Sequence, residues 1–250
     1  MKILLPNAKE LNTNLDNRPF SPLSAHSQQV VEKLASYPLI DLAKFYKISE
    51  DRAQLEADRW ERIRQGQGRS YPAFKLYDGL MYRYMKRYDL TLDEERYLAK
   101  HVRLATGLYG LISPFEYIAP HRLDFQGSLE IEGKSLKLYW REQYDRLVEG
   151  DELLISLLSS EFEQVFSPRI QKRLVRIVFV EEKDGQQKIH STISKKGRGR
   201  LVSLMAQERI TDLNSLMELT FDGFQYAESL SQSQKLVFVR RKQGEPMEFI

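Results

Sequence analysis

Residues 175–193, VRIVFVEEKDGQQKIHSTI, contain two β-like runs separated by an Asp-Gly pair. The runs 175–182 and 187–193 carry the β-branched and aromatic residues that favour strands. Asp184-Gly185 is the strongest short hairpin signal in the chain, because both residue types accept the positive φ angles of a tight turn. We therefore expect a β-hairpin here and a sheet in the second half of the chain.

Further strands and helices are indicated on both sides of this hairpin. Apolar runs typical of strands occur at 3–5, 153–158 and 235–241. Helical patterns occur at 28–36, 39–46, 49–64 and from Thr91 to about residue 105. Capping-box spacing occurs at Thr91/Glu94 and Ser160/Glu163. We expect one α+β domain over residues 1–250 with a mixed sheet and surrounding helices. The alternative is a helical first half packed on a sheet-bearing second half.

Composition limits the class of protein. The 38 Lys and Arg residues face 35 Asp and Glu residues, for a net charge of +3. Affinity for nucleic acid would therefore have to come from local clusters of cations. The chain has no cysteine, which excludes disulfides, thiolate metal sites and removal of peroxide by a thiol cycle. We expect a cytoplasmic protein without a membrane partner, because no apolar run approaches the roughly 20 residues of a membrane span.

The segment 194–200, SKKGRGR, is the first candidate functional site. Its cations are Lys195, Lys196, Arg198 and Arg200, with glycines interleaved, and a helical run begins at residue 201. A glycine-loosened turn that leads into a helix N-terminus offers free backbone N–H groups, which together with these cations would suit a phosphate. A solvated strand-to-helix connection is the alternative interpretation.

The segment 105–111, ATGLYGL, is the second candidate. Gly107 and Gly110 lie between the helix expected from Thr91 and a new helix start at Ser113. This pattern resembles a helix-hairpin-helix element over about residues 92–120, in which backbone N–H groups would contact a DNA phosphate. A plain corner between two helices explains the glycines equally well, so both interpretations stay open.

Signals for catalysis or metal binding are weaker. The four histidines are scattered, and His101, His121 and Asp124 form the only plausible local cluster for iron. We expect no resident metal and no cofactor. Glu161 follows the expected strand 153–158 and is the candidate general base, because sites in α/β folds gather at the carboxyl ends of strands. A carboxylate that stabilises the first turn of a helix is the simpler explanation of Glu161.

Seven short motifs occur in an order that matches one family. They are Ala8-Lys9, Phe74-Lys75, 107–111, 120–123, Tyr139-Trp140, 158–162 and 195–199. Together they resemble the bacterial peroxide-stress protein YaaA family. The resemblance implies a compact mixed α/β fold with a positively charged cleft, an embedded helix-hairpin-helix, DNA binding and the lowering of free iron during peroxide stress. The residues that it marks are Lys9, Lys75, Arg122, Glu161, Lys195, Lys196 and Arg198.

The chain also departs from the family pattern at two hydroxyl-bearing positions. Pro6-Asn7 stands where the family has Ser-Pro, and Phe162 stands where it has Tyr. Any chemistry that needs these hydroxyls is therefore in doubt for this chain.

Three functional hypotheses follow. The first is a non-enzymatic protein of the peroxide stress response that binds phosphates of duplex or branched DNA by shape, without strong sequence preference, and is linked to limiting free-iron damage. The second is an enzyme acting on a phosphorylated or nucleotide-like small molecule, with Lys9, Arg122 and Lys195 holding the anion and Glu161 as base. The third is an iron-handling protein. The second requires its residues to converge on one closed pocket of small-ligand volume.

Overall fold

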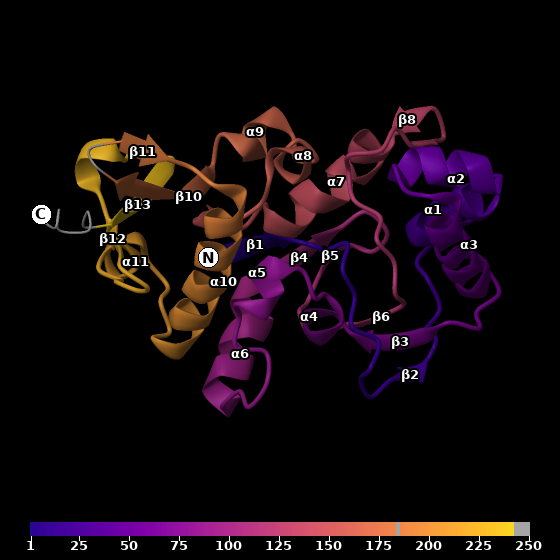
Figure 1. Cartoon of the computed structure of the whole chain (residues 1–250), viewed down its shortest axis with the longest axis horizontal. Coiled ribbons are helices and arrows are strands. Elements are labelled where there is room, and N and C mark those ends of the chain that lie inside the picture. Colours follow the sequence, from indigo (N-terminus) through magenta and orange to yellow (C-terminus); the bar gives the residue numbers. More distant parts are fainter. Residues whose placement is uncertain (184–185, 243–250) are drawn as a thin grey trace, which may run out of the picture.

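The N-terminal strand β1 lies in the middle of an eight-stranded sheet in the computed structural model, which describes residues 1–183 and 186–242 (Figure 1). The strand order is β12-β13-β10-β9-β1-β4-β5, and β11 pairs with β10. The pairs from β13 to β4 are parallel, whereas β12, β11 and β5 are antiparallel to their neighbours. The expected α+β class with a mixed sheet is therefore confirmed. The strands are β1 (Lys2–Pro6), β4 (Val102–Thr106), β5 (Gly110–Ile112), β9 (Leu154–Ser156), β10 (Leu174–Lys183), β11 (Gln186–Lys188), β12 (Phe224–Tyr226) and β13 (Lys235–Lys242).

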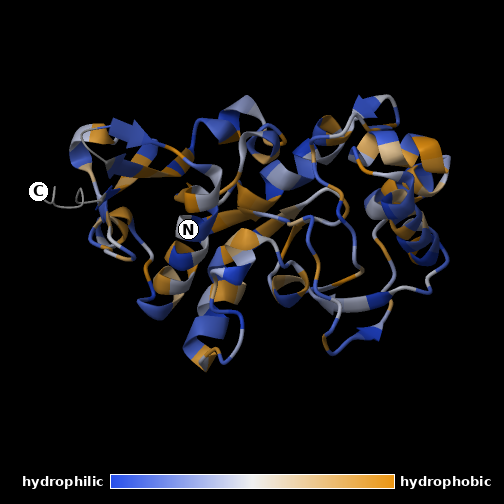
Figure 2. Cartoon of the chain, in the orientation of Figure 1, coloured by the Kyte–Doolittle hydropathy of each residue, from blue (hydrophilic) through white to orange (hydrophobic). Residues whose placement is uncertain are grey.

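Helices cover both faces of this sheet, and each face has its own hydrophobic core. Successive side chains of a strand point to opposite faces, so Ile3 and Leu5 of β1 enter one core while Leu4 enters the other. Figure 2 shows the apolar residues concentrated along the central strands. The first core is covered by α4 (Ala73–Leu76), α5 (Leu80–Arg83), α6 (Leu92–His101), α10 (Ser191–Gln207) and α11 (Leu213–Met217). The second is covered by α1 (Ala25–Ala35), α2 (Leu39–Tyr46), α3 (Glu50–Arg64), α7 (Leu136–Val148), α8 (Ser160–Glu163) and α9 (Pro168–Gln171).

Short elements complete the described part of the chain. The strands β2 (Arg18–Pro19), β3 (Arg69–Pro72) and β6 (Tyr117–Ile118) form one small sheet, and β7 (Glu130–Ile131) pairs with β8 (Lys134–Ser135). A 3₁₀ turn, η1, covers Glu228–Leu230. No helix within residues 1–183 and 186–242 has the length and apolar character needed to cross a membrane.

Several expectations from the sequence are confirmed. The strands expected at 3–5, 153–158, 175–182 and 235–241 are present as β1, β9, β10 and β13. The capping box is present, since Thr91 Oγ1 accepts from the N–H of Glu94 (3.2 Å) and the Glu94 carboxylate accepts from the N–H of Thr91 (2.7 Å). The antiparallel pairing of β10 with β11 is also present, while the Asp184-Gly185 turn itself lies outside the described residues.

The strand expected at 187–193 is wrong over most of its length. Strand β11 ends at Lys188, and helix α10 begins at Ser191. The basic segment 194–200 is therefore the interior of a helix, with its backbone N–H groups used in helical hydrogen bonds. The idea of a loose turn with free N–H groups is corrected accordingly.

The helix-hairpin-helix expected over residues 92–120 is not formed. Helix α6 ends at His101, and the strands β4 and β5 follow as a β-hairpin instead of a second helix. The alternative of a corner between two helices is wrong for the same reason. Strand β4 completes the sheet beside β1, where four of its five side chains are buried. Gly110 adopts a φ of +76° at the end of the hairpin turn, a conformation that favours glycine.

The expected Ser160/Glu163 capping box is also wrong. The N-cap residue of α8 is Ser159, and it makes no side-chain capping bond. The Glu163 carboxylate instead accepts a hydrogen bond from Ser156 Oγ (2.6 Å) and pairs with Arg176 Nε (2.7 Å). The Glu163 side chain therefore binds residues of the strands β9 and β10 instead of capping the helix, as the sequence pattern had indicated.

Candidate functional site

A cavity of about 440 Å³ opens where the loops after β1 and β9 meet. Its lining comes from residues 6–10, 79–82, Asp124, Gln126, Ser159, Glu161, Phe162 and two residues of α10. The chain leaves β1 to form β4 on one side and later adds β9 on the other side. The cavity therefore lies outside the carboxyl ends of parallel strands at a reversal of strand order, the usual position of ligand sites in such sheets.

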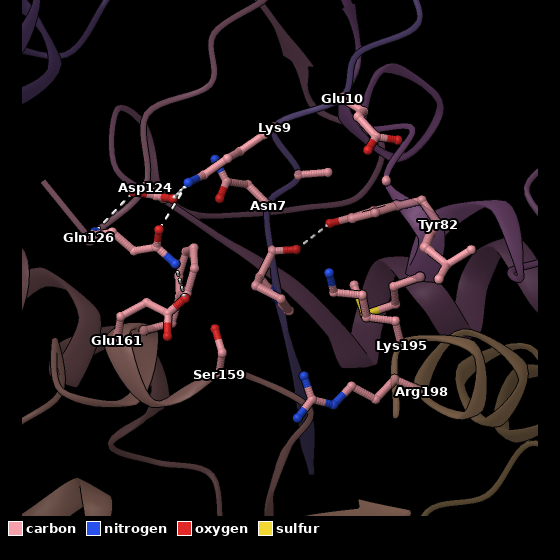
Figure 3. Close-up of a pocket in the computed structure, with 16 residues that line it drawn as sticks. Asn7, Lys9, Glu10, Tyr82, Asp124, Gln126, Ser159, Glu161, Lys195 and Arg198 are labelled. Carbon is pink, nitrogen blue, oxygen red and sulfur yellow. Dashed lines mark hydrogen bonds and ion pairs between the residues drawn. The ribbon is translucent and has the colours of Figure 1, made fainter. Parts of the chain in front are cut away.

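One wall of the cavity is a chain of hydrogen-bonded side chains, shown in Figure 3. Lys9 Nζ lies 2.9 Å from an oxygen of Asp124 and donates to Gln126 Oε1 (3.0 Å). Gln126 Nε2 in turn donates to Glu161 Oε1 (3.1 Å). Because Asp124 neutralises it, Lys9 is the least available of the cavity's cations for a bound anion.

Glu161 is held in its ionised form. Burial raises the pKa of its carboxyl, but hydrogen bonds from its own N–H, Ser159 and Gln126, with the charge of Lys137, lower the pKa further, so that the net shift is downward. A carboxyl with a lowered pKa stays ionised and can accept hydrogen bonds, but it is a poor general base at neutral pH. The role suggested by the sequence, general base, is therefore disfavoured by the surroundings of Glu161.

The opposite wall carries two cations from α10. Lys195 and Arg198 are three positions apart on the helix and therefore share a face, and both line the cavity. Neither side chain makes a hydrogen bond or an ion pair with the described residues, and Arg198 Nε is buried without a partner. Burial lowers the pKa of Arg198 against the opposing influence of Glu163 and Glu161, yet a guanidinium stays charged in proteins.

Two glycines allow α10 to lie this close to its neighbours. A Cβ atom at Gly197 would come within 2.7 Å of the Phe179 ring, and one at Gly199 within 2.2 Å of the carbonyl oxygen of Met81. The glycines of the basic segment therefore serve close packing on β10 and α5. Their functional consequence is indirect, because this packing sets where Lys195 and Arg198 lie.

The other cations marked by the sequence lie outside this cavity. Lys75 Nζ lies 5.1 Å from the centre of the Tyr88 ring, and Lys196 Nζ lies 4.8 Å from that of Tyr84. Arg200 Nε pairs with Asp222 at 3.4 Å. These three side chains therefore have local partners of their own, and the cations marked by the sequence do not form one cluster.

Arg122 and the two hairpin glycines are also separate from the cavity. The Arg122 guanidinium lies 5.8 Å from the centre of the Tyr46 ring. The carbonyl oxygen of Gly107 accepts a bond from Trp140 Nε1 (2.9 Å), and a Cβ at Gly110 would lie 2.9 Å from that same indole. Gly110 therefore serves packing against Trp140, and Gly107 serves packing against Leu123, where a Cβ atom would lie 2.8 Å from its side chain.

The expected iron cluster does not assemble. His121 is fully buried, and its Nδ1 accepts from the N–H of Leu123 (3.3 Å) while Nε2 lies 3.3 Å from the Tyr77 hydroxyl. His101 Nδ1 lies 3.0 Å from the carbonyl oxygen of Met1. Within residues 1–183 and 186–242, no three His, Asp or Glu side chains are grouped so that they could hold a metal ion.

Several cavity residues, Asn7 and Gln126 among them, had no role in the sequence-based hypotheses. Asn7, whose Nδ2 donates to the carbonyl oxygen of Leu123 (2.8 Å), and Gln126 are single polar residues without a motif. The available signal was position, because Asn7 directly follows the buried strand β1. Pro6 and Phe162, where the chain departs from the family pattern, also line the cavity.

Comparisons with known proteins identify the family of this chain. The profile of the family described as "Peroxide stress protein YaaA" matches residues 1–230. The chain belongs to the YaaA family. Relatives of this YaaA-type chain include a UPF0246 protein of Streptococcus gordonii, 44% identical over 98% of this chain and all of the relative. Others come from Streptococcus sanguinis (44%) and Streptococcus pneumoniae (45%), each over 96% of this chain and 99% of the relative.

Proposed function

We propose that this member of the YaaA family binds a small phosphorylated, nucleotide-like molecule in the cavity between β1, β9 and α10. The observation that carries the proposal is the pair Lys195 and Arg198, two cations on the wall of a cavity whose side chains have no partner within residues 1–183 and 186–242. A buried guanidinium nitrogen without an acceptor is costly, and a phosphate oxygen would satisfy it. Arginine and lysine together suit phosphate as fork and point charge.

The dimensions of the cavity support a small ligand. Its volume of about 440 Å³ falls in the range of roughly 300–1,000 Å³ typical of small-molecule pockets. The cavity is lined by three of the four residues that the small-molecule hypothesis names, Lys9, Lys195 and Glu161, together with Arg198. Arg122, which that hypothesis also included, does not line it, so the anion would be held by α10 with little help from the first half of the chain.

Binding rather than turnover is the activity proposed. The lowered pKa of Glu161, set by the balance of burial against its hydrogen bonds, favours a carboxylate that accepts hydrogen bonds from a ligand. Protection against peroxide and free iron, which the family resemblance implies, would then act through the bound molecule.

DNA is the second candidate ligand. The specific observation in its favour is that Lys195 is exposed at the cavity wall and lacks an ion-pair partner among the described residues, so a backbone phosphate of duplex or branched DNA would find a cation there. The dispersal of Lys75, Lys196 and Arg200 to other local partners weighs against a long contact surface.

Calorimetric titration with inorganic phosphate and with AMP tests the proposal. We expect saturable binding of AMP that Arg198→Gln weakens at least about tenfold, since a charged hydrogen bond contributes about 1.5–3 kcal/mol. Lys195→Gln should weaken it less, because Lys195 is exposed. Arg52→Gln is the matched control, an exposed arginine whose side chain makes no hydrogen bond or ion pair with the described residues.

Two results of these titrations would contradict the proposal. If neither probe saturates the wild-type protein, or if Arg198→Gln binds AMP as tightly as Arg52→Gln does, the cavity is not an anion site. Duplex DNA that binds with a steep salt dependence, and that AMP does not displace, would favour the second candidate.

A further inference from the structure

Arg198 and Glu161 lie on opposite walls of the cavity and do not form an ion pair with each other (Figure 3). They are nevertheless close enough for the Glu161 charge to raise the pKa of Arg198 against the larger influence of burial. Two unlike charges that face one cavity without contact leave room for a molecule that meets each of them with a different group.

Glu161 can accept hydrogen bonds and cannot donate them. An ionised carboxylate has about four lone-pair positions. Gln126 Nε2 occupies one of them at 3.1 Å, and the Glu161 N–H and the Ser159 side chain also donate to this carboxylate. The remaining acceptor capacity asks for an O–H or N–H group of a ligand. A second phosphate at this position would be repelled.

The hydrogen bonds behind Glu161 keep its carboxylate oriented as an acceptor for a donor group of the ligand. Lys9 Nζ donates to Gln126 Oε1 (3.0 Å), so the amide nitrogen of Gln126 must face Glu161. The backbone N–H of Gln126 also donates to Asp124 Oδ1 (2.9 Å), which anchors the same segment. Lys9 thus acts as a positioning residue, because it sets the orientation of the amide that holds Glu161.

We infer that Glu161 is a specificity residue that selects phosphomonoesters carrying a free aliphatic hydroxyl group. The phosphate lies against Arg198 and Lys195, and the donor group of the same molecule lies against Glu161. Sugar phosphates and ribonucleoside monophosphates have this chemistry. Bisphosphates do not fit, and neither does the DNA backbone, whose sugars carry no free hydroxyl. The inference rests on the proposed function and narrows its ligand class.

Matched pairs of probes test the inference. Glycerol 3-phosphate and propyl phosphate share a phosphate and a three-carbon chain but differ in two hydroxyl groups, and AMP and 2′,3′-dideoxyadenosine monophosphate differ likewise. We expect the hydroxylated member of at least one pair to bind about tenfold more tightly to the wild-type protein. Glu161→Gln should reduce that preference to less than about threefold, while the affinity for inorganic phosphate stays or increases.

Two further variants control the experiment. Lys9→Met should reduce the preference in the same direction, without loss of phosphate binding, because it frees the Gln126 amide. Glu152 is an exposed glutamate whose side chain makes no hydrogen bond or ion pair with the described residues. Glu152→Gln should therefore leave the preference for the hydroxylated probe unchanged. Far-ultraviolet circular dichroism of each variant checks the fold.

The outcomes separate this inference from the proposed function. If both members of both pairs bind with equal affinity through Arg198, the donor selection by Glu161 is wrong and the anion site stands. The same holds if Glu161→Gln keeps the full preference. If no phosphate probe binds and Arg198→Gln changes nothing, the proposed function itself is wrong.

Discussion

His121 illustrates what a single buried side chain does in this protein. Its Nδ1 accepts from the Leu123 N–H, so the proton of the neutral ring is on Nε2, which faces the Tyr77 hydroxyl. Burial, with a smaller effect of the Arg59 charge, lowers the pKa of His121 to about 3. The ring is thus a neutral structural bridge, although the sequence offered it as an iron ligand.

This shift predicts a pH dependence of stability. The unfolded chain binds a proton at His121 below about pH 6.5 and the folded protein does not, so stability is present above that pH and decreases as pH falls toward 3, by about 1.4 kcal/mol per pH unit at most. Urea unfolding between pH 7 and pH 4.5 measures this slope. His121→Gln should lower the slope by up to one proton, since glutamine does not titrate. Equal slopes for both proteins would contradict the buried neutral ring.

Single residues also show the limit of prediction from sequence. The small-molecule hypothesis placed Lys9, Arg122, Lys195 and Glu161 at one site, and all of them except Arg122 line one cavity, where Arg198 joins them. Their partners were not predictable, because Lys9 reaches Asp124 across more than a hundred positions of sequence. A sequence motif identifies the charged side chain, but whether an opposite charge neutralises it depends on the fold.

At the scale of elements, glycine caused the two main errors of prediction. Glycine usually weakens a helix, so the glycines at 197 and 199 suggested a turn where α10 continues unbroken. Likewise Gly107 and Gly110 suggested a corner between helices where β4 and β5 form a hairpin. Both cases depend on close tertiary contacts that local sequence does not contain. Elements with a strong local signal, such as the Thr91 capping box, were predicted correctly.

The packing of α10 predicts the effect of adding one methyl group. Gly199→Ala would gain about 1 kcal/mol of helix propensity but would drive its Cβ into the Met81 carbonyl oxygen, 2.2 Å away. Because that atom belongs to the backbone of α5, we expect a net destabilisation of about 1–3 kcal/mol, measured by urea unfolding.

The control is Gly150→Ala, where a Cβ would meet no atom within 4 Å, and it should change stability little. Weaker AMP binding by Gly199→Ala would further indicate that the position of α10 sets the site. A Gly199→Ala protein as stable as the wild type would show that the helix does not need this close approach.

At the scale of the molecule, β1 connects the fold to the site. It is the strand from which the order reverses, with β4 on one side and β9 on the other, and its carboxyl end opens into the cavity. The sequence indicated the buried run at 3–5 but not its central position, because the parallel pairings of β1 join residues about a hundred and a hundred and fifty positions apart. Strand order is a long-range property that local periodicity does not encode.

The shared sheet predicts that the two cores unfold together. Leu4 packs in the core that contains Trp60 and Trp140, while Ile3 and Leu5 pack in the core on the other face, so neither core can lose β1 without loss to both. Tryptophan fluorescence reports the core that contains Trp60 and Trp140, and far-ultraviolet circular dichroism reports helices on both faces. In urea, the two signals should give the same midpoint and slope. The His121→Gln and Gly199→Ala variants, one in each half of the chain, should shift both probes equally. Two separated transitions would instead mean that residues 1–250 contain more than one cooperative unit, as the alternative of a helical half packed on a sheet-bearing half requires.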